Sequence, residues 1–367
     1  MNYYENELKA LEKSGRLRKR ELYPDGIKDF ATNDYLGLAH QKSLHVKTSK
    51  QLLDEDILAP KASLLVGGYH KIHQQFEQKL CRLNGFEDGV VVGSGFNANI
   101  ALIEALVRKS DILLMDESYH ASGILPSQLP YIEVEYFKHN DMTHLEELLK
   151  KYHTKKRRIV AVEGIYSMEG DMVPKEVFEL SQKYDALLVV DEAHSSGVVG
   201  DDLLGVFDYY GVTIEPNFIK MGTLGKGYGS FGAYILASQH IISYLLNRAK
   251  PLIYATALSL YDTLLATNAL EYIQTNKESL KQKIAFRQQL VQKILGIDIA
   301  GLILPVVIND NKRVVQIKNE LLDEGYFIGA IREPTVPKAI LRIIARVGED
   351  ENEFEELLLM IKNRYLC

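Results

Sequence analysis

The chain alternates short apolar runs with segments in which apolar residues recur at helical spacing. The apolar runs, rich in Val and Ile, indicate buried strands, while 97–109, 143–152 and 174–184 have the spacing of amphipathic helices. Because strands that alternate with helices form parallel β/α units, this pattern predicts a large, mostly parallel sheet with helices on its faces. The expected strands are 89–94, 111–117, 132–137, 158–167, 186–194, 218–222 and 232–238.

The pattern turns helical after the last of these strands. A long helix is expected through 268–295, and residues 300–367 have the order strand, helix, strand, strand, helix, which predicts a compact α+β unit. At 367 residues the chain also exceeds what a single hydrophobic core usually covers. We therefore expect an N-terminal segment at 1–35, a large domain at 36–272 and a small C-terminal domain at 273–367.

The composition is that of a folded protein, with 46% hydrophobic residues, 25% charged residues and a mean hydropathy of -0.11. The net charge of -6 argues against broad nucleic-acid binding, because neutralising phosphates requires an excess of Lys and Arg on one face. An anionic ligand must therefore be bound by a local group of donors.

Cysteine and histidine usage argues against a disulfide framework and against a metal site. The two cysteines, Cys81 and Cys367, favour a reducing compartment. His70 and His73 are too few to form a zinc site with Cys81, so we expect them on a helix surface and expect no metal. The sequence has neither a leader-like apolar core near its start nor an apolar run approaching the roughly 20 residues of a membrane span. We expect a cytoplasmic protein that does not enter a membrane.

One glycine pattern resembles a dinucleotide-binding turn. Gly93, Gly95 and Ala98 form G-x-G-x-x-A between an expected strand and an expected helix, with Asp116 or Glu117 near the distance of a ribose-binding acid. The pattern lies far into the chain, however, and no second nucleotide-binding half is apparent, so we disfavour a dinucleotide. The amides at this helix N-terminus would hold any phosphate group.

A second pattern, the run Asp-Glu-Ala-His at 191–194, spells the acidic box of certain helicases. A phosphate-binding loop should precede such a box. The candidate loop at 222–227 instead follows it, lacks one spacer residue and has Gly where Ser or Thr should meet the metal. We therefore disfavour an ATPase.

Single functional groups at successive strand ends suit a flat heteroaromatic cofactor that carries a phosphate, and pyridoxal phosphate fits this set. Its chemistry requires a lysine amine, an acid for the pyridinium nitrogen and donors for the phosphate. Lys226 lies among glycines that let the backbone approach a ligand closely, and Asp191 ends an apolar run, so its carboxylate should be half-buried. The alternatives are a solvated surface lysine and a helix N-cap.

A series of motifs follows along the chain: NDYLGLAH (33–40), GSGFNAN (93–99), DESYHAS (116–122), EGIYSMEGD (163–171), DEAHSSGVVG (191–200), TLGKGYG (223–229), LIYATALS (252–259) and IREPTVP (331–337). In order and spacing they resemble the α-oxoamine synthase family, from about residue 30 to 345. The resemblance implies a fold-type I pyridoxal-phosphate enzyme. It also implies a homodimer with active sites at the subunit interface that condenses an amino acid with an acyl thioester and releases carbon dioxide.

The resemblance also implies a role for each matching residue around the cofactor. Lys226 would be the Schiff-base lysine and proton shuttle, and Asp191 the partner of the pyridine nitrogen. His120 would stack over the ring, and His194 would touch its 3-oxygen. The implied phosphate ligands are the amides of Gly95 and Phe96 and the side chain of Thr223, with Ser167 nearby and Thr256 reaching in from the other subunit.

Substrate roles follow from the same resemblance. Asn33 and Arg332 would bind the amino-acid carboxylate, where Arg332 offers a bidentate fork, and Thr335 would bind the acyl substrate. Arg18 matches only loosely, because the basic run at 16–20 permits other registers.

Within the family, residues 331–337 most resemble the branch that joins L-alanine to a pimeloyl thioester in biotin biosynthesis. The alternatives are the branch that joins glycine to acetyl-CoA, and a non-catalytic α/β binding protein. The acyl carrier is either coenzyme A or an acyl carrier protein, and the sequence leaves that choice open.

The chain departs from the family at 59–64, where many relatives have a glycine-rich stretch with an arginine. Pro60 should stiffen this loop, and Leu64 replaces the arginine. Lys61 is then either a replacement positive charge for the thioester carrier or a solvated loop lysine.

Overall fold

The computed structural model describes residues 3–14, 16–18 and 20–366. A seven-stranded sheet has the order β2-β8-β7-β6-β5-β3-β4, in which β8 is antiparallel to both neighbours and the other pairs are parallel. The expected α/β fold with a mostly parallel sheet is therefore confirmed. The strands are β2 (Asp88–Val92), β3 (Ile112–Asp116), β4 (Val134–Phe137), β5 (Arg158–Glu163), β6 (Leu187–Asp191), β7 (Phe218–Thr223) and β8 (Ala233–Ala237).

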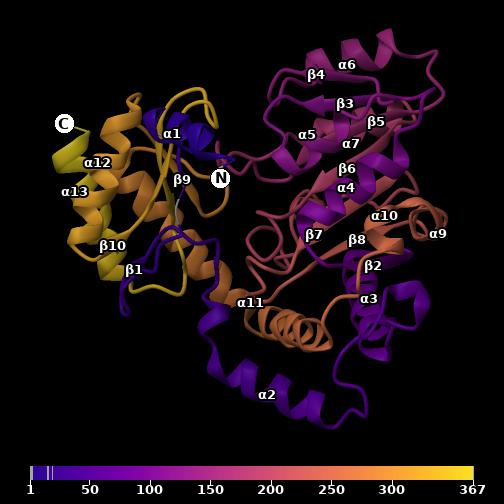
Figure 1. Cartoon of the computed structure of the whole chain (residues 1–367), viewed down its shortest axis with the longest axis horizontal. Helices are drawn as coiled ribbons and strands as arrows, with labels where there is room; N and C mark the ends of the chain where they lie inside the picture. The colour runs from indigo at the N-terminus through magenta and orange to yellow at the C-terminus, as the bar shows by residue number, and fades with distance from the viewer. Residues whose placement is uncertain (1–2, 15, 19, 367) are drawn as a thin grey trace.

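Helices cover both faces of this sheet (Figure 1) and create a two-sided core. On β6, Leu188 and Val190 belong to one buried apolar cluster and Val189 to the other. Because successive side chains of a strand point to opposite faces, a strand buried on both faces must be apolar throughout. The helices of this large unit are α3 (Lys71–Asn84), α4 (Gly95–Leu106), α5 (Ala121–Ser127), α6 (Met142–Lys151), α7 (Glu176–Lys183), α8 (Val206–Tyr209), α9 (Gln239–Arg248) and α10 (Lys250–Ile253).

A smaller unit, orange to yellow in Figure 1, lies beside the sheet. Its three-stranded antiparallel sheet has the order β11-β12-β9. The long helix α11 (Leu260–Leu295) packs against α3 and also against the last helix of the small unit, so the boundary expected at residue 272 lies inside this helix. The elements are β9 (Ile303–Val307), α12 (Asn311–Asp323), β10 (Tyr326–Phe327), β11 (Gly329–Ile331), β12 (Ile340–Ile344) and α13 (Glu351–Tyr365).

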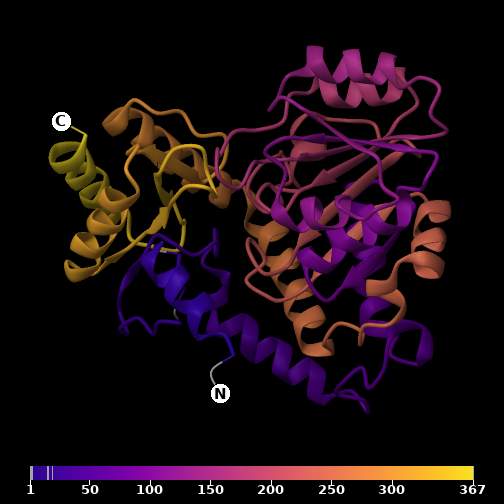
Figure 2. The ribbon, with the colours of Figure 1, turned by 45° about the horizontal axis from the view of Figure 1, so that its top comes forward.

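The N-terminal segment, indigo in Figure 2, runs from the small unit to the large one. After α1 (Glu5–Lys13), β1 (Lys28–Asp29) pairs in parallel with β10, and α2 (Lys42–Leu53) packs along α11. Between them the chain passes close to the small unit at Gly37, where φ is 70° and an added Cβ would lie 2.7 Å from the Cα of Gly348. Only glycine fits this backbone contact.

The expectation that His70 and His73 lie on a helix surface was wrong for His73. His73 is fully buried in the first turn of α3, where its Nδ1 accepts a hydrogen bond from the backbone N–H of His70. Its Nε2 lies 2.7 Å from the carbonyl oxygen of Leu258, and burial lowers its pKa. The side chain is therefore a structural tie between α3 and the start of α11.

Within residues 3–14, 16–18 and 20–366, no helix combines the length and apolar character needed to cross a bilayer. Across the same described part of the chain, no three His, Cys, Asp or Glu side chains are grouped as metal ligands.

Arg346 ties the N-terminal segment to the small unit. Its side chain is 1% exposed and binds both the backbone and the carboxylate of Asp29 and of Asp34, and it pairs with Glu349. These contacts fix the stretch of chain that carries Asn33.

We predict that Arg346→Ala lowers the free energy of unfolding by about 3–5 kcal/mol, because it removes a buried cation and leaves three carboxylates, each at most 20% exposed, without their partner. Denaturant unfolding followed by circular dichroism measures this loss. Arg364→Ala is the matched control, since Arg364 makes an exposed ion pair with Glu324 that should contribute about 0–1 kcal/mol. Equal losses in the two variants would contradict the role assigned to Arg346.

Candidate active site

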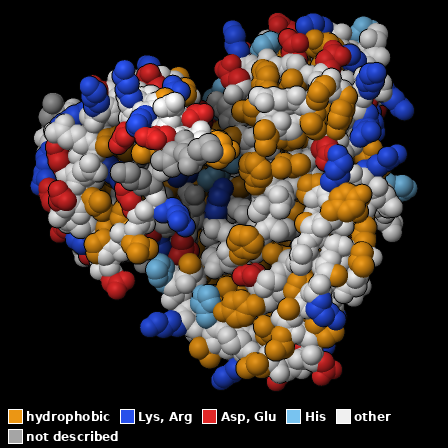
Figure 3. All heavy atoms as spheres, in the orientation of Figure 1, with side chains coloured by type: hydrophobic (Ala, Val, Ile, Leu, Met, Phe, Trp, Pro, Cys, Tyr) orange, Lys and Arg blue, Asp and Glu red, His pale blue; other side chains and the backbone are white. Residues whose placement is uncertain are grey.

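The carboxyl ends of β5, β6 and β7 border a pocket of about 310 Å³, closed on its other side by the N-terminal segment and β12. In the space-filling view the molecule is hollowed between its two units, and basic and histidine side chains are visible there (Figure 3). This is the position where open α/β sheets bind ligands. The lining residues are Asn33, Gly95, Phe96, Asn99, His120, Ser122, Glu163, Ser167, Met168, Asp191, Ala193, His194, Met221, Thr223, Lys226 and Arg342.

Asp191 is the last residue of β6 and is 4% exposed. Its carboxylate accepts hydrogen bonds from Nδ2 of Asn99 at 2.8 Å and from the backbone N–H of Ala193 at 2.9 Å. Donors of this kind compensate a buried charge, so the environment suits an ionised carboxylate.

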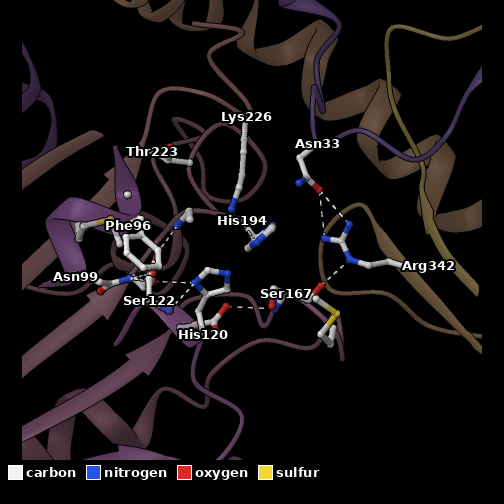
Figure 4. Close-up of a pocket in the computed structure, with 16 residues that line it drawn as sticks. Asn33, Phe96, Asn99, His120, Ser122, Ser167, His194, Thr223, Lys226 and Arg342 are labelled. Carbon is white, nitrogen blue, oxygen red and sulfur yellow. Dashed lines mark hydrogen bonds between the residues drawn. The ribbon is translucent and has the colours of Figure 1, made fainter. Parts of the chain in front are cut away.

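Asn99 continues this network away from the carboxylate. Its Nδ2 also donates to Oγ of Ser122 at 2.8 Å, and its Oδ1 accepts from the hydroxyl of Tyr119. Ser122 in turn lies 2.7 Å from Nδ1 of His120, the N-cap of α5 (Figure 4). The His120 ring is thereby oriented through the same chain of contacts that holds Asp191.

Lys226 lies in the glycine-rich loop after β7, and its Nζ is 2.8 Å from Nε2 of His194 (Figure 4). Burial lowers the pKa of Lys226 to about 8, although the Asp191 carboxylate acts in the opposite direction. A lysine amine with this pKa is partly deprotonated near neutral pH and is therefore a competent nucleophile.

His194 is held as a neutral ring, because burial and the nearby Lys226 cation lower its pKa well below the ordinary value. Its Nδ1 contacts the hydroxyl of Tyr35, and that hydroxyl donates to Oδ1 of Asn33 at 3.4 Å. With Lys226 donating to Nε2, the network assigns the ring proton to Nδ1.

Arg342, on β12, faces the pocket from the small unit. Its Nε donates to the carbonyl oxygen of Ser167 at 2.7 Å, and its Nη1 and Nη2 lie 3.1 and 3.2 Å from Oδ1 of Asn33. In Figure 4 Asn33 and Arg342 lie on one side of the pocket, and Phe96, Asn99 and Ser122 lie on the other. The guanidinium is thus held in place at its rim and is available to a carboxylate.

The N-terminus of α4 forms a further part of the wall. Ser94 caps the helix by accepting a hydrogen bond from the backbone N–H of Asn97, and Gly95 and Phe96 begin it. The first N–H groups of a helix have no intrahelical acceptor, so they bind anions. Thr223 is adjacent, since a Cβ added at Gly95 would lie 3.7 Å from its Cβ.

Most of the residues expected from the sequence are brought together by the fold. Nine of the thirteen line the pocket, and four do not. The nine are Asn33, Gly95, Phe96, His120, Ser167, Asp191, His194, Thr223 and Lys226.

The other four lie outside this pocket, each at a different place in the fold. Arg18 is exposed in the N-terminal segment, and Thr256 is exposed and forms a bridge with Ser63. Arg332 follows the end of β11, and Thr335 is exposed in the turn before β12. The arginine that the fold places beside Asn33 is Arg342.

Sequence reasoning missed Asn99, Ser122, Glu163 and Arg342. The first three lie inside the motifs quoted above, so their closeness in sequence to an expected site residue could have identified them. Arg342 is the single charged residue of the strand Ile340–Ile344, and a charge in a buried strand calls for a partner.

A buried lysine with a lowered pKa, next to a hydrogen-bonded carboxylate and a helix N-terminus, fits one cofactor chemistry. The amine can bond an aldehyde, the carboxylate can hold a pyridinium nitrogen, and the free amides can hold a phosphate. With a mostly parallel seven-stranded sheet, the site defines the class of fold-type I pyridoxal-phosphate enzymes. The family model of class I and II aminotransferases matches residues 25–361. The chain belongs to this family, and within it to the pyridoxal-phosphate-dependent α-oxoamine synthases.

Individual relatives support this assignment. The 8-amino-7-oxononanoate synthase of Helicobacter pylori is 39% identical, over 98% of this chain and 97% of its own, and that of Petrotoga mobilis is 34% identical, over 94% and 92%. A solved 8-amino-7-oxononanoate synthase from Francisella tularensis has a TM-score of 0.74 at 25% identity, covering 92% of this chain and 97% of that one. The serine palmitoyltransferase of S. paucimobilis shares the fold, with a TM-score of 0.86 at 23% identity, over 98% and 96%.

The lowered pKa of Lys226 gives a direct test. When the protein is incubated with pyridoxal phosphate and borohydride, labelling of Lys226 should rise with pH around a midpoint near 8, because only the neutral amine reacts. Peptide mass spectrometry measures the label, and the exposed Lys250, whose pKa is raised by Glu104, serves as the internal control.

In Asp191→Asn the midpoint for Lys226 should fall, because the carboxylate that does most to raise this pKa is gone. A wild-type midpoint near 10.5, the ordinary lysine value, would contradict the account.

Proposed function

We propose that the protein catalyses the decarboxylative condensation of L-alanine with a pimeloyl thioester. The products are 8-amino-7-oxononanoate, carbon dioxide and the free thiol carrier, in biotin biosynthesis. The observation that carries this proposal is the pairing of Arg342 with Asn33 across a small pocket from Lys226 and His194. This arrangement offers a carboxylate site and an amine within one cavity, and the relatives named above supply the substrate class.

In this proposal the residues of the sheet-side wall would hold the cofactor. Lys226 would bond its aldehyde carbon, Asp191 would hold its pyridine nitrogen, and His120 would cover the ring. The α4 N-terminus, with Gly95 and Phe96, would hold the phosphate. Further contacts would come from Thr223, Ser167, His194 and, from a second subunit, Thr256. When bound, pyridoxal phosphate supplies an electron sink for the bond-breaking at the amino-acid Cα.

Residues of the chain then transfer the proton and bind the carboxylate of the amino-acid substrate. The reaction breaks the bond from Cα to the carboxylate carbon, forms a bond from Cα to the acyl carbon and breaks the thioester bond, and one proton is taken up as the thiol forms. Lys226, with a pKa of about 8, can both give and accept a proton near neutral pH. Neutral His194 accepts a hydrogen bond from Nζ of Lys226 and so orients it.

Arg342 is the residue that we assign to the amino-acid carboxylate, with Asn33 beside it. A planar guanidinium that is already fixed by Ser167 can bind a carboxylate through two parallel hydrogen bonds. Arg18, Arg332 and Thr335 lie outside the pocket, and their substrate roles stay predictions. Thr335 is the one we expect to contact the acyl substrate.

A homodimer is the second part of the proposal. The loop at 59–64 is tied to the chain before α11, because Ser63 bridges Thr256 and the backbone N–H of Ala257 donates to Ala62 O. Exposed apolar side chains surround this tie, namely Leu65 (54% exposed), Val66 (74%) and Tyr254 (77%). Apolar side chains gathered around one loop favour a protein interface, and a second copy would bring Thr256 to its partner's site.

The experiment that tests the reaction is a grid of amino acids and thioesters. Alanine, glycine and serine, each labelled in the carboxyl carbon, are paired with acetyl-CoA, pimeloyl-CoA and pimeloyl-acyl carrier protein. We expect release of labelled carbon dioxide with alanine and a pimeloyl thioester, and none from Lys226→Ala. Turnover of glycine with acetyl-CoA alone would replace the proposal with the glycine acetyltransferase reaction, and no release from any pair would refute it.

Arg342→Lys should raise the KM for alanine about tenfold or more, because a point charge replaces a bidentate fork. The KM for the thioester should change much less, and steady-state kinetics separate the two. Arg332→Lys is the comparison, since it makes the same change at the position expected from the sequence. An alanine effect confined to Arg332→Lys would return the carboxylate site to Arg332.

A further inference from the structure

Two carboxyl groups lie side by side at the floor of the pocket. Glu163 ends β5 and Asp191 ends β6, and the two residues are register partners in this parallel pair. Register partners on neighbouring parallel strands direct their side chains to the same face of the sheet. Glu163 is 1% exposed and Asp191 is 4% exposed, so both carboxyl groups are shielded from water.

The two groups differ in the donors that reach them. Asp191 accepts hydrogen bonds from Asn99 and from the backbone of Ala193. Glu163 accepts one, from the backbone N–H of Ser167 to Oε2 at 3.2 Å, and its Oε1 has no partner among the described residues. The hydrogen-bond donors therefore stabilise a negative charge on Asp191, whereas a negative charge on Glu163 would be poorly compensated.

Burial and the neighbouring carboxylates also disfavour a charge on Glu163. Burial is the main cause that raises the pKa of Glu163 well above its ordinary value, and the Asp191 carboxylate is the second. Glu169, on the loop after β5, adds to this effect, whereas Lys226 opposes it. Two buried carboxylates at adjacent strand ends cannot both ionise without a large cost.

Hydrogen bonds also connect Glu163 to the residues on the other side of the pocket. The backbone of Ser167 makes two hydrogen bonds: its N–H donates to Glu163, and its carbonyl oxygen accepts from Nε of Arg342. Arg342 then meets Asn33. The hydrogen bonds that fix the Arg342 guanidinium of the small unit therefore end at Glu163 in the large unit.

We propose that Glu163 is a positioning residue that works as a neutral carboxylic acid. It anchors the backbone of Ser167, and through that residue Arg342, without adding a second negative charge beside Asp191. An ionised Glu163 would keep the Lys226 amine protonated and would compete with a substrate carboxylate for the same cationic region. This inference deepens the proposed function, on which the role of Arg342 rests.

Infrared difference spectroscopy of the apoprotein tests the protonation state. We expect the wild-type minus Glu163→Gln spectrum at pH 8 to contain the carbonyl band of a protonated carboxyl group. Glu77 is the confounding group, because burial raises its pKa to about 7. Glu77→Gln is therefore the matched control, and its band should weaken from pH 6 to pH 8 while that of Glu163 persists. Absence of the Glu163 band at pH 8 would overturn the proposal.

The pKa of Lys226, measured by the labelling midpoint, gives a second readout. It should fall in Asp191→Asn and stay at the wild-type value in Glu163→Gln, since the latter removes no charge. A fall in Glu163→Gln of the size seen in Asp191→Asn would show an ionised Glu163 and would overturn the proposal.

Kinetics test the positioning role. Glu163→Leu should raise the KM for alanine about five- to tenfold, the effect of one lost hydrogen bond, with a smaller change in kcat. Glu163→Gln keeps an oxygen for the Ser167 N–H and should restore most of that loss. An alanine KM that is unchanged in Glu163→Leu would overturn the positioning role. The infrared test needs no substrate, so failure of alanine to react would count against the proposed function and not against the neutral acid.

Discussion

The burial of one negative charge at the end of β6 is the constraint on which the site depends. Asp191 can remain a carboxylate out of contact with water because Asn99 and the backbone of Ala193 donate to it. That charge sets the surroundings of Lys226, since it opposes the burial that brings the lysine pKa to about 8. The same charge disfavours ionisation of its register partner, Glu163. One fixed carboxylate thus bears on the protonation of the groups around it.

Hydrogen bonds across the pocket also join the two units. Hydrogen bonds run from Lys226 through His194 and Tyr35 to Asn33, and from Arg342 through the backbone of Ser167 to Glu163. The N-terminal segment that carries Asn33 is held by Arg346, which follows β12, the strand that carries Arg342. The pocket is therefore closed by residues from the sheet, the N-terminal segment and the small unit, so its geometry depends on their packing together.

The strands and most of the sheet-side pocket could be predicted from the sequence, because their signals are local. Apolar runs mark the buried strands, and Lys226 and Asp191 lie in short motifs at strand ends. Arg342 could not be found this way, because its partner Asn33 lies 309 positions away and a lone charge in an apolar strand gives no direction. His73 was wrongly expected on a surface for the same reason, since its partner Leu258 lies 185 positions away. Contacts between distant segments arise from tertiary packing, which a local pattern does not contain.

We propose that Asp191 is the ionised carboxylate that would meet the cofactor nitrogen. Nitrogen-15 NMR of the protein reconstituted with ring-labelled pyridoxal phosphate tests it most directly. We expect the chemical shift of a protonated pyridine nitrogen in the wild-type protein and that of an unprotonated one in Asp191→Asn. An unprotonated nitrogen in the wild-type protein, or a protonated one that persists in Asp191→Asn, would contradict it.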